Sequence, residues 1–136
     1  RKPSFKLFQK FKKQFEAINS KNGLNQQLIP YFISSHPGCE LEDMADLAAE
    51  TKKLGFKLEQ VLDFTPTPMT LATVIYYSGY HPYTLKKVYT ARGKNEKQDQ
   101  NRFFFWYKKE NAGWIKNTLS SLKRFDLLNI LLTGKR

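Results

Sequence analysis

The stretch that decides the fold is Leu28–Phe64, LIPYFISSHPGCELEDMADLAAETKKLGFKLEQVLDF. It opens with Leu28–Ser35, an almost continuously apolar segment of the kind expected for a strand buried on both faces. A turn at His36–Gly38 leads into a helical pattern over Glu40–Leu54, and a second strand pattern, Leu58–Phe64, follows. A strand, a helix and a strand with short links predict a βαβ unit, in which the two strands are parallel neighbours.

Charge marks both ends of the central helix predicted over Glu40–Leu54. Acidic side chains in its first turn lie near the positive end of the helix dipole, and lysines in its last turn lie near the negative end. Gly55 follows, at a position where helices often end in a left-handed residue. The acidic residues are Glu40, Glu42 and Asp43, and the lysines are Lys52 and Lys53.

A second amphipathic helix is predicted before this unit, over Ser4–Asn22. Its apolar stripe recurs at three- and four-residue steps, and its lysines lie mostly off the stripe. The stripe consists of Phe5, Phe8, Phe11, Phe15 and Ile18. A basic amphipathic helix can lie on a membrane, fit a partner's groove, or dock on its own domain. We expect docking, because a strand pattern follows at once.

After the βαβ unit the pattern becomes mainly helical. Thr65–Pro68 stops regular structure, and Ser78–Arg92 is loop-like, with a short strand as an option at Val88–Thr90. Phe125–Leu132 is expected to continue the last helix after a break. The predicted helices are Met69–Tyr77, where β-branched residues leave a strand possible, Asn95–Lys108, and Ala112–Lys123, which Asn111 would cap.

Length and composition bound the class of protein. The 136 residues fit one domain. The single cysteine excludes an internal disulfide framework and a metal site built on several thiolates, and it fits the reducing cytoplasm. No apolar run approaches the roughly 20 residues that span a bilayer. We therefore expect a cytoplasmic protein without a membrane partner.

The net charge of +11 is unevenly distributed along the chain. Residues 1–30 carry +6, residues 31–80 carry −4, and residues 81–136 carry +9. Cationic flanks attract RNA or an acidic partner or substrate, and they also occur as ordinary solvated surface. If the flanks form one exposed face, a polyanion should bind there.

The run Arg102–Lys109 places five aromatic residues between basic ones. Aromatic rings can stack on nucleic-acid bases while basic side chains hold phosphates. Five successive aromatics also cover every face of a helix, so some of them have to be buried. We therefore favour a core role over nucleic-acid binding.

Neither a catalytic residue nor a metal ligand is predicted from the motifs. Ser34, Ser35 and His36 lack a nucleophile elbow, and neighbours on a strand point to opposite faces. His36, Cys39 and His81 lack the spacing of a zinc site. The turn at His36–Gly38 and the loop at Phe64–Pro68 instead leave two parallel strands at the same edge, where ligands of α/β folds bind.

Several stretches resemble the C-terminal part of YgiQ-like radical S-adenosylmethionine proteins. They are PYFISSHPG at Pro30–Gly38, EDM at Glu42–Met44, DFTPTPMT at Asp63–Thr70, and YYSG with HPYT between Tyr76 and Thr84. The resemblance is collinear from about Gln27 to Arg92 and weaker in the basic tail. It implies a parent enzyme with a partial parallel barrel, and a CxxxCxxC motif whose four-iron four-sulfur cluster cleaves S-adenosylmethionine. That motif is not in this chain.

The resemblance implies an α/β fold, made of a βαβ fragment of the partial barrel over residues 1–92 and a basic, mainly helical extension over residues 93–136. It implies that the chain is the C-terminal region of an enzyme whose substrate is unassigned. This region alone would be inactive and would bind no cluster, and its partner would be the rest of the polypeptide. The rival hypotheses are a basic RNA-binding module and a protein-docking module. Late strand ends of the superfamily approach the adenosine, which implies cofactor-binding positions at Ser34, Ser35, His36, Phe64, Thr65 and Pro66.

Overall fold

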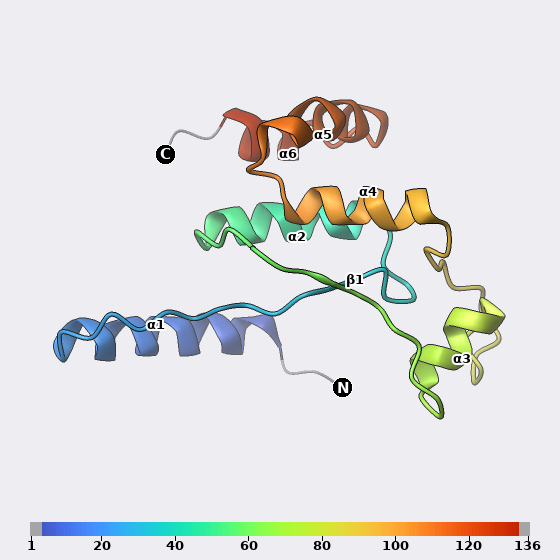
Figure 1. Ribbon diagram of the computed structural model, residues 1–136, viewed down its shortest axis with the longest axis horizontal. Helices are drawn as coiled ribbons and strands as arrows, with labels where there is room; N and C mark the ends of the chain where they lie inside the picture. The colour runs from blue at the N-terminus through green and yellow to red at the C-terminus, as the bar shows by residue number, and fades with distance from the viewer. Residues whose placement is uncertain (1–3, 134–136) are drawn as a thin grey trace. The chain divides into compact units, whose positions relative to one another are not determined.

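The computed structural model describes residues 4–133 and separates into two compact units, which meet in sequence between Pro30 and Tyr31. The described residues form a mostly helical α/β structure with one small parallel sheet (Figure 1). Residues 1–3, at the start of the predicted region 1–92, and residues 134–136, at the end of the predicted region 93–136, lie outside the described residues. No helix within residues 4–133 is both long enough and apolar enough to cross a membrane.

The first unit is built on helix α1, Phe5–Lys21, as the sequence predicts. The Ser4 hydroxyl caps its start by accepting a hydrogen bond from the Lys6 amide at 3.3 Å. After the helix, the side-chain amide of the buried Asn19 donates to the Gln26 carbonyl at 2.8 Å. This bond holds the returning chain against the end of its own helix.

The second unit contains the predicted βαβ arrangement. Strand β1, Ile33–Ser34, pairs in parallel with strand β2, Leu62–Asp63, and helix α2, Leu41–Lys53, connects them. The carbonyl oxygens of Phe32 and Ser34 accept hydrogen bonds from the second strand, from the Leu62 amide at 3.3 Å and the Phe64 amide at 2.8 Å. The parallel pairing is confirmed, although each strand is much shorter than predicted.

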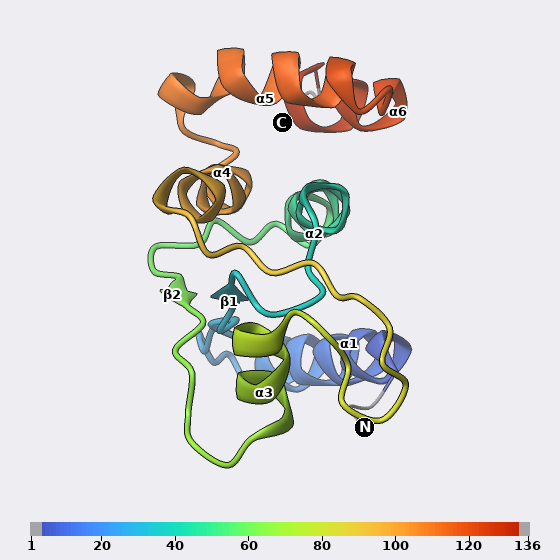
Figure 2. The same cartoon turned by 90° about the vertical axis from the view of Figure 1, so that its right-hand side faces the viewer.

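The expectation that the first strand is buried on both faces is wrong for the described residues. Ile29, Tyr31 and Ile33 are 88%, 71% and 48% exposed. Residues alternate between the two faces of a strand, and only the face that carries Phe32 and the fully buried Ser34 is covered. The helices α2 and α4 lie on one side of the sheet (Figure 2).

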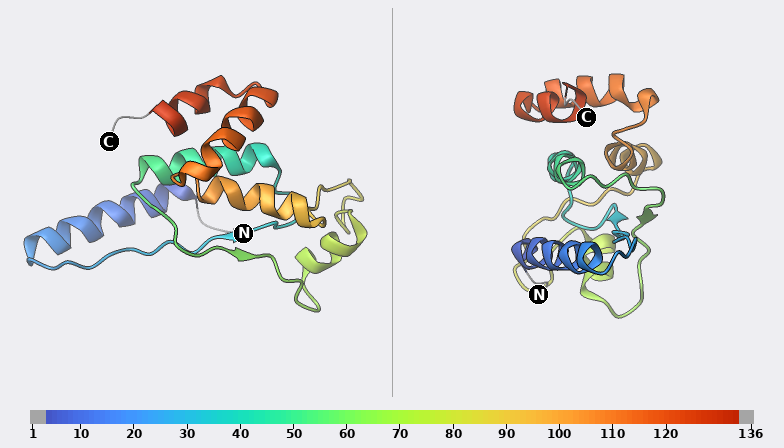
Figure 3. Two further views of the ribbon diagram at one scale, coloured as in Figure 1. Left: turned by 45° about the horizontal axis from the view of Figure 1, so that its top comes forward. Right: turned by 90° about the vertical axis from the view of Figure 1, so that its left-hand side faces the viewer.

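The hydrophobic core lies among the helices of the second unit. Helix α2 packs against α4, Lys94–Phe104, and the chain continues through α5, Lys109–Ser121, α6, Phe125–Leu128, and a π-helical turn, Asn129–Thr133. Figure 3 shows α2 and α4 next to the sheet, with α5 and α6 on the side of these helices away from the sheet. The buried apolar residues are Met44, Ala45, Ala48, Ala49, Leu58, Phe103, Phe104, Ile115, Leu119, Leu127 and Leu131. The expected continuation of the last helix after a break is confirmed by α6 and the turn after it.

The prediction of Asn111 as a helix cap is wrong, because α4 ends earlier and α5 begins earlier than expected. The residue before the first turn of α5 is Lys108, and the Asn111 side chain donates to the Phe105 carbonyl at 3.0 Å. Two aromatic side chains hold the intervening turn. The Trp106 indole donates to the Thr51 hydroxyl at 3.2 Å, and the Tyr107 hydroxyl donates to the Leu58 carbonyl at 2.6 Å.

Helix α3, Leu71–Ser78, follows the second strand, and a loop connects it to α4. The Thr70 hydroxyl caps its start, and Gly79 ends it at φ 76°, a left-handed conformation that glycine adopts without strain. The optional strand at Val88–Thr90 does not form. An antiparallel bridge joins Tyr80 to Lys87 instead, which leaves this loop as a short, closed hairpin.

We predict that Phe104→Ala lowers the free energy of unfolding by about 3–5 kcal/mol, because Phe104 is 1% exposed and its removal leaves a cavity. The matched control is Phe125→Ala, since Phe125 is 60% exposed and its loss should change stability by about 0.5 kcal/mol or less. Urea unfolding followed by circular dichroism measures both. Equal effects of the two substitutions would contradict the assigned core.

Candidate functional site

The structure brings together the two loops that were predicted to share a ligand-facing edge. The imidazole of His36 packs edge-on against the Phe64 ring, with 5.1 Å between ring centroids. Phe64 also follows directly after β2 and donates its amide to Ser34 of the neighbouring strand. The carboxyl ends of β1 and β2 therefore form one continuous surface in the second unit.

Ser34 and Ser35 lie beneath this surface, and both are fully buried. The Ser34 hydroxyl donates to the Asp63 carboxylate, and the Asn101 side chain donates to the same carboxylate oxygen at 3.0 Å. Ser35 adopts a left-handed backbone conformation with φ 59°. The two serines thus fix the position of the strand ends, and their predicted contact with a cofactor stays a prediction.

Gln100 of α4 holds the start of the turn after β1. Its side chain is completely buried, and its oxygen accepts a hydrogen bond from the Ser35 amide at 2.8 Å. Its nitrogen donates to the Cys39 carbonyl at 2.7 Å. Sequence reasoning missed this residue. Its spacing from Phe103 and Phe104, three and four positions along the helix, places it on the buried face and could have indicated its role.

The other four predicted site residues are accessible. His36 and Thr65 are exposed, whereas Phe64 and Pro66 are half-buried. The Thr65 hydroxyl donates to the Asp63 carbonyl at 3.4 Å, directly after β2. His36, Phe64, Thr65 and Pro66 are therefore the predicted residues that a ligand at this edge can reach.

Tyr76 of α3 extends the site, and sequence analysis did not select it. Its ring lies 5.6 Å from that of Phe64. The guanidinium of Arg92 and the ammonium of Lys97 each lie 5.8 Å from the Tyr76 ring centroid. Arg92 also donates to the Tyr77 carbonyl at 2.9 Å. Two cations and an aromatic pair thus adjoin the strand ends, an arrangement suited to an anionic or aromatic ligand.

Among residues 4–133, Cys39 belongs to no group of side chains that could hold a metal ion. Its sulfur lies 3.3 Å from the Met44 sulfur, and burial, followed by the nearby Asp43 carboxylate, raises the pKa of its thiol to about 11. Metal ligation requires the thiolate. Within residues 4–133, no group of three or more His, Cys, Asp or Glu side chains is arranged to hold a metal ion.

The aromatic run near the end of α4 contributes to the core, as expected. Phe103 and Phe104 are buried, and Trp106 and Tyr107 are half-buried and bonded to the protein interior. These rings are therefore not free to stack on nucleic-acid bases.

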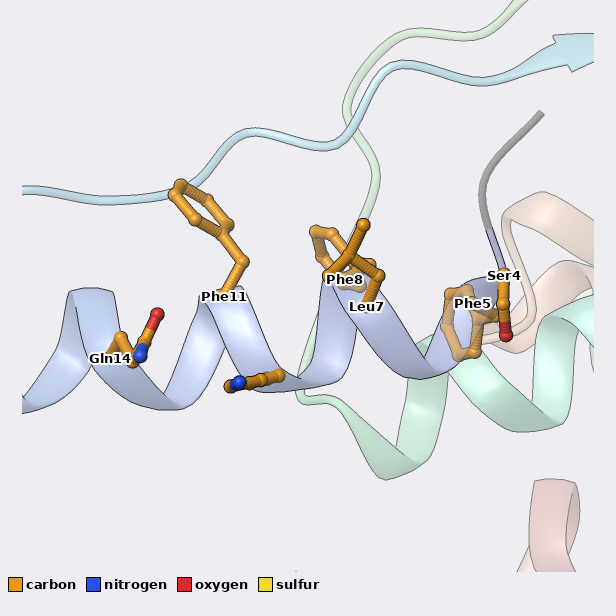
Figure 4. A pocket seen from close by; sticks show the side chains of 7 residues that line it. Ser4, Phe5, Leu7, Phe8, Phe11 and Gln14 are labelled. Carbon is orange, nitrogen blue, oxygen red and sulfur yellow. The ribbon is translucent and has the colours of Figure 1, made fainter.

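An open apolar groove lies along α1 in the first unit, and it is lined by residues of that helix and by its capping residue Ser4. Figure 4 shows the side chains of Phe8 and Phe11 projecting from the same side of the helix. Phe5, Leu7 and Phe11 are 47%, 58% and 50% exposed. The expectation that this stripe docks on the chain's own domain stays a prediction.

Comparison with known proteins assigns the chain to a family. Residues 59–131, more than half of the chain, match the family described as a domain of unknown function (DUF3362), and the chain belongs to that family. The match begins just before β2 and ends within the last helical turn. No solved structure matches the chain.

The chain is similar to proteins named UPF0313 protein. It is 64% identical to that of Porphyromonas gingivalis over 94% of this chain and 20% of the relative, and 60% identical to that of Bacteroides thetaiotaomicron over 100% and 22%. It is 42% identical to the UPF0313 protein of Methanocella arvoryzae, over 93% and 21%. The chain thus spans about a fifth of the length of these curated relatives.

We predict that Gln100→Leu destabilises the protein by about 2–5 kcal/mol, because it leaves the buried Ser35 amide and Cys39 carbonyl without partners. Gln98→Leu is the control, since Gln98 lies on the same helix with an exposed side chain. Urea unfolding should show a large loss for the first variant and about 0.5 kcal/mol or less for the second. If Gln100→Leu also costs only about 0.5 kcal/mol or less, the hydrogen bonds of Gln100 with Ser35 and Cys39 contribute little to stability.

Proposed function

We propose that this chain is the C-terminal region of a radical S-adenosylmethionine iron–sulfur enzyme, in which β1 and β2 are two strands of a partial parallel barrel. The observation that carries the proposal is the parallel pair β1–β2, at whose outer edges no further strand lies within residues 4–133. The motif resemblance at Pro30–Gly38 and Asp63–Thr70, and the much greater length of the relatives, support the same proposal.

The hydrogen-bond pattern of β1 and β2 supports further strands on both sides. Phe32 and Ser34 turn their carbonyl groups toward β2, so the alternate residues Tyr31 and Ile33 turn their backbone groups to the opposite edge. By the same alternation, Asp63 turns its amide away from β1. Unpaired strand edges beside exposed apolar side chains are typical of a sheet that continues. The rest of the larger protein would supply these strands.

The iron–sulfur cluster does not fit this chain. A four-iron cluster requires several thiolates, whereas the chain has one cysteine, whose thiol stays protonated near neutral pH. In the proposal, the cluster ligands therefore belong to other parts of the larger protein. No step of cluster chemistry is assigned to a residue described here.

The strand ends fit the adenosine part of S-adenosylmethionine better than they fit the cluster. Phe64 offers a half-buried ring for the adenine to contact, and the exposed His36 packs against that ring in a T-shaped arrangement. Thr65 and Pro66 would line the same side of the ligand. Ser34 and Ser35 would act indirectly, by holding these loops through Asp63 and Gln100. When bound with the cluster, S-adenosylmethionine would supply the radical that starts the reaction.

We predict that the larger protein, reconstituted anaerobically with iron and sulfide, binds one four-iron cluster and cleaves S-adenosylmethionine to 5′-deoxyadenosine and methionine after reduction. The present chain, treated in the same way, should bind no stoichiometric cluster. Iron and sulfide analysis and chromatography of the nucleoside product measure these outcomes. A larger protein that binds no cluster, or a cluster on the present chain, would contradict the proposal.

The site itself is tested with Phe64→Ala in the larger protein, which should weaken S-adenosylmethionine binding about tenfold, the loss expected for one stacked base. Cluster content should not change, because Phe64 is not a ligand in the proposal. Phe125→Ala, which removes an exposed ring on α6, is the control. Equal affinity of the two variants would remove Phe64 from the site without affecting the cluster assignment.

A further inference from the structure

Residues 76–97 combine tyrosines and cations in a way that the proposed reaction does not use. This segment holds five of the chain's seven tyrosines, five lysine or arginine residues, and a single acidic residue. It spans the end of α3, the following loop and the first turn of α4. We refer to its outward residues as the tyrosine–lysine surface. They are Tyr77, Tyr80, Tyr83, Tyr89, Lys86, Lys87, Arg92 and Lys94.

Backbone hydrogen bonds hold the loop that presents this surface. The Val88 amide donates to the Gly79 carbonyl at 2.8 Å, and the His81 amide donates to the Lys86 carbonyl at 2.9 Å. The Gly38 amide donates to the Tyr89 carbonyl at 2.8 Å, which ties the loop to the turn after β1. Because these bonds hold the loop to itself and to the turn after β1, its backbone loses little conformational entropy when a ligand binds.

Tyrosine rings at the end of α3 and in the loop after it are exposed. Tyr83 is 83% exposed, Tyr77 is 69% exposed and Tyr80 is 50% exposed. The Tyr83 ring is steadied by His81, whose ring centroid lies 5.8 Å away. Exposed tyrosines on an ordered backbone offer flat faces on which nucleic-acid bases stack.

The positive charge of the surface is available to a ligand. In the part of the chain that the structure describes, no ion pair engages Lys86, Lys87 or Lys94. Glu96, the acid of this segment, accepts hydrogen bonds from the amides of Gly93 at 2.7 Å and Arg92 at 3.1 Å and from the Tyr89 hydroxyl at 3.3 Å, and the carboxylates of Glu40 and Asp99 also lie near Tyr89. The backbone hydrogen bond from Gly93 is the main reason that the pKa of the Glu96 carboxyl lies below its usual value. Glu96 therefore shapes the start of α4 and remains ionised there.

We propose that the tyrosine–lysine surface binds single-stranded nucleic acid. The lysines would contact phosphates, and Tyr77, Tyr80 and Tyr83 would stack on unpaired bases. Charge alone also suits an acidic protein, but the exposed rings of Tyr77, Tyr80 and Tyr83 beside the lysines favour a ligand that carries both phosphates and stacking bases. The surface adjoins the strand ends through Arg92, which lies over the Tyr76 ring beside Phe64. The binding of nucleic acid to this surface does not depend on the proposed radical chemistry. A role of the nucleic acid as the substrate of that chemistry does rest on the proposed function.

The experiment uses the native larger protein without its cluster, so that binding is measured apart from the reaction. Fluorescein-labelled RNA and DNA strands of the same unpaired sequence, about 16 nucleotides long, are titrated by fluorescence anisotropy. Four phosphate contacts, one for each exposed cation of the surface, predict a roughly 50-fold loss of affinity between about 50 and about 200 mM salt. Tighter binding of RNA than of DNA would show that the protein recognises the 2′-hydroxyl group. Equal binding would show that the surface accepts single-stranded RNA and single-stranded DNA alike.

Two sets of variants test the surface. Lys86→Gln, Lys87→Gln and Lys94→Gln together should weaken binding about 30-fold or more and flatten the salt dependence, because about three phosphate contacts are lost. The matched control replaces Lys57, Lys109 and Lys116 with Gln, which removes the same charge from exposed positions elsewhere. Tyr83→Leu should weaken binding about tenfold and Tyr83→Trp should preserve it, because only the second keeps a stacking face.

Three results would overturn the proposal. They are the absence of binding at low salt, an equal loss from both triple lysine variants, and indifference to Tyr83→Leu. Inorganic polyphosphate of matched charge, which has no bases, separates the two parts of the interaction. If polyphosphate competes as well as the nucleic acid does, the surface is a general anion site, or a site for an acidic protein, and the stacking role is wrong.

Discussion

The second unit depends on one buried carboxamide, that of Gln100. It joins α4 to the end of β1 through the Ser35 amide and to the start of α2 through the Cys39 carbonyl. Buried polar backbone groups need partners, and here one side chain supplies a partner for each of two such groups. The same helix contributes Phe103 and Phe104 to the core. Apolar packing and the position of the strand ends are therefore set by a single helix.

The local elements were predictable because their signals are local. Charged first and last turns marked α2, and the apolar stripe of α1 followed a helical period. The parallel pairing of β1 and β2 followed from the order of elements and the short links between them. The start of α5 could not be predicted in this way. It depends on Trp106 and Tyr107, whose partners lie about 50 residues away in the sequence.

The candidate site was predictable only in part for the same reason. The loops at His36 and Phe64 lie together because parallel strands place their carboxyl ends at one edge. Gln100, Asn101 and Tyr76 reach that edge from helices that come later in the chain. Spacing along α4 places Gln100 on the buried face, but it does not show which strand end these side chains contact. Burial of β1 on both faces was wrong in the described residues, because a strand's second face depends on what packs against it.

The central claim is that the β1–β2 pair is the interior of a larger sheet, and amide hydrogen exchange tests it most directly. The amides of Tyr31, Ile33 and Asp63 point to the open edges by the alternation of the parallel ladder. In the isolated chain these amides should exchange rapidly. In the larger protein they should be protected about 100-fold or more, because neighbouring strands would bond them. Equal, rapid exchange in both proteins would contradict the claim and leave β1 and β2 as a complete two-stranded sheet.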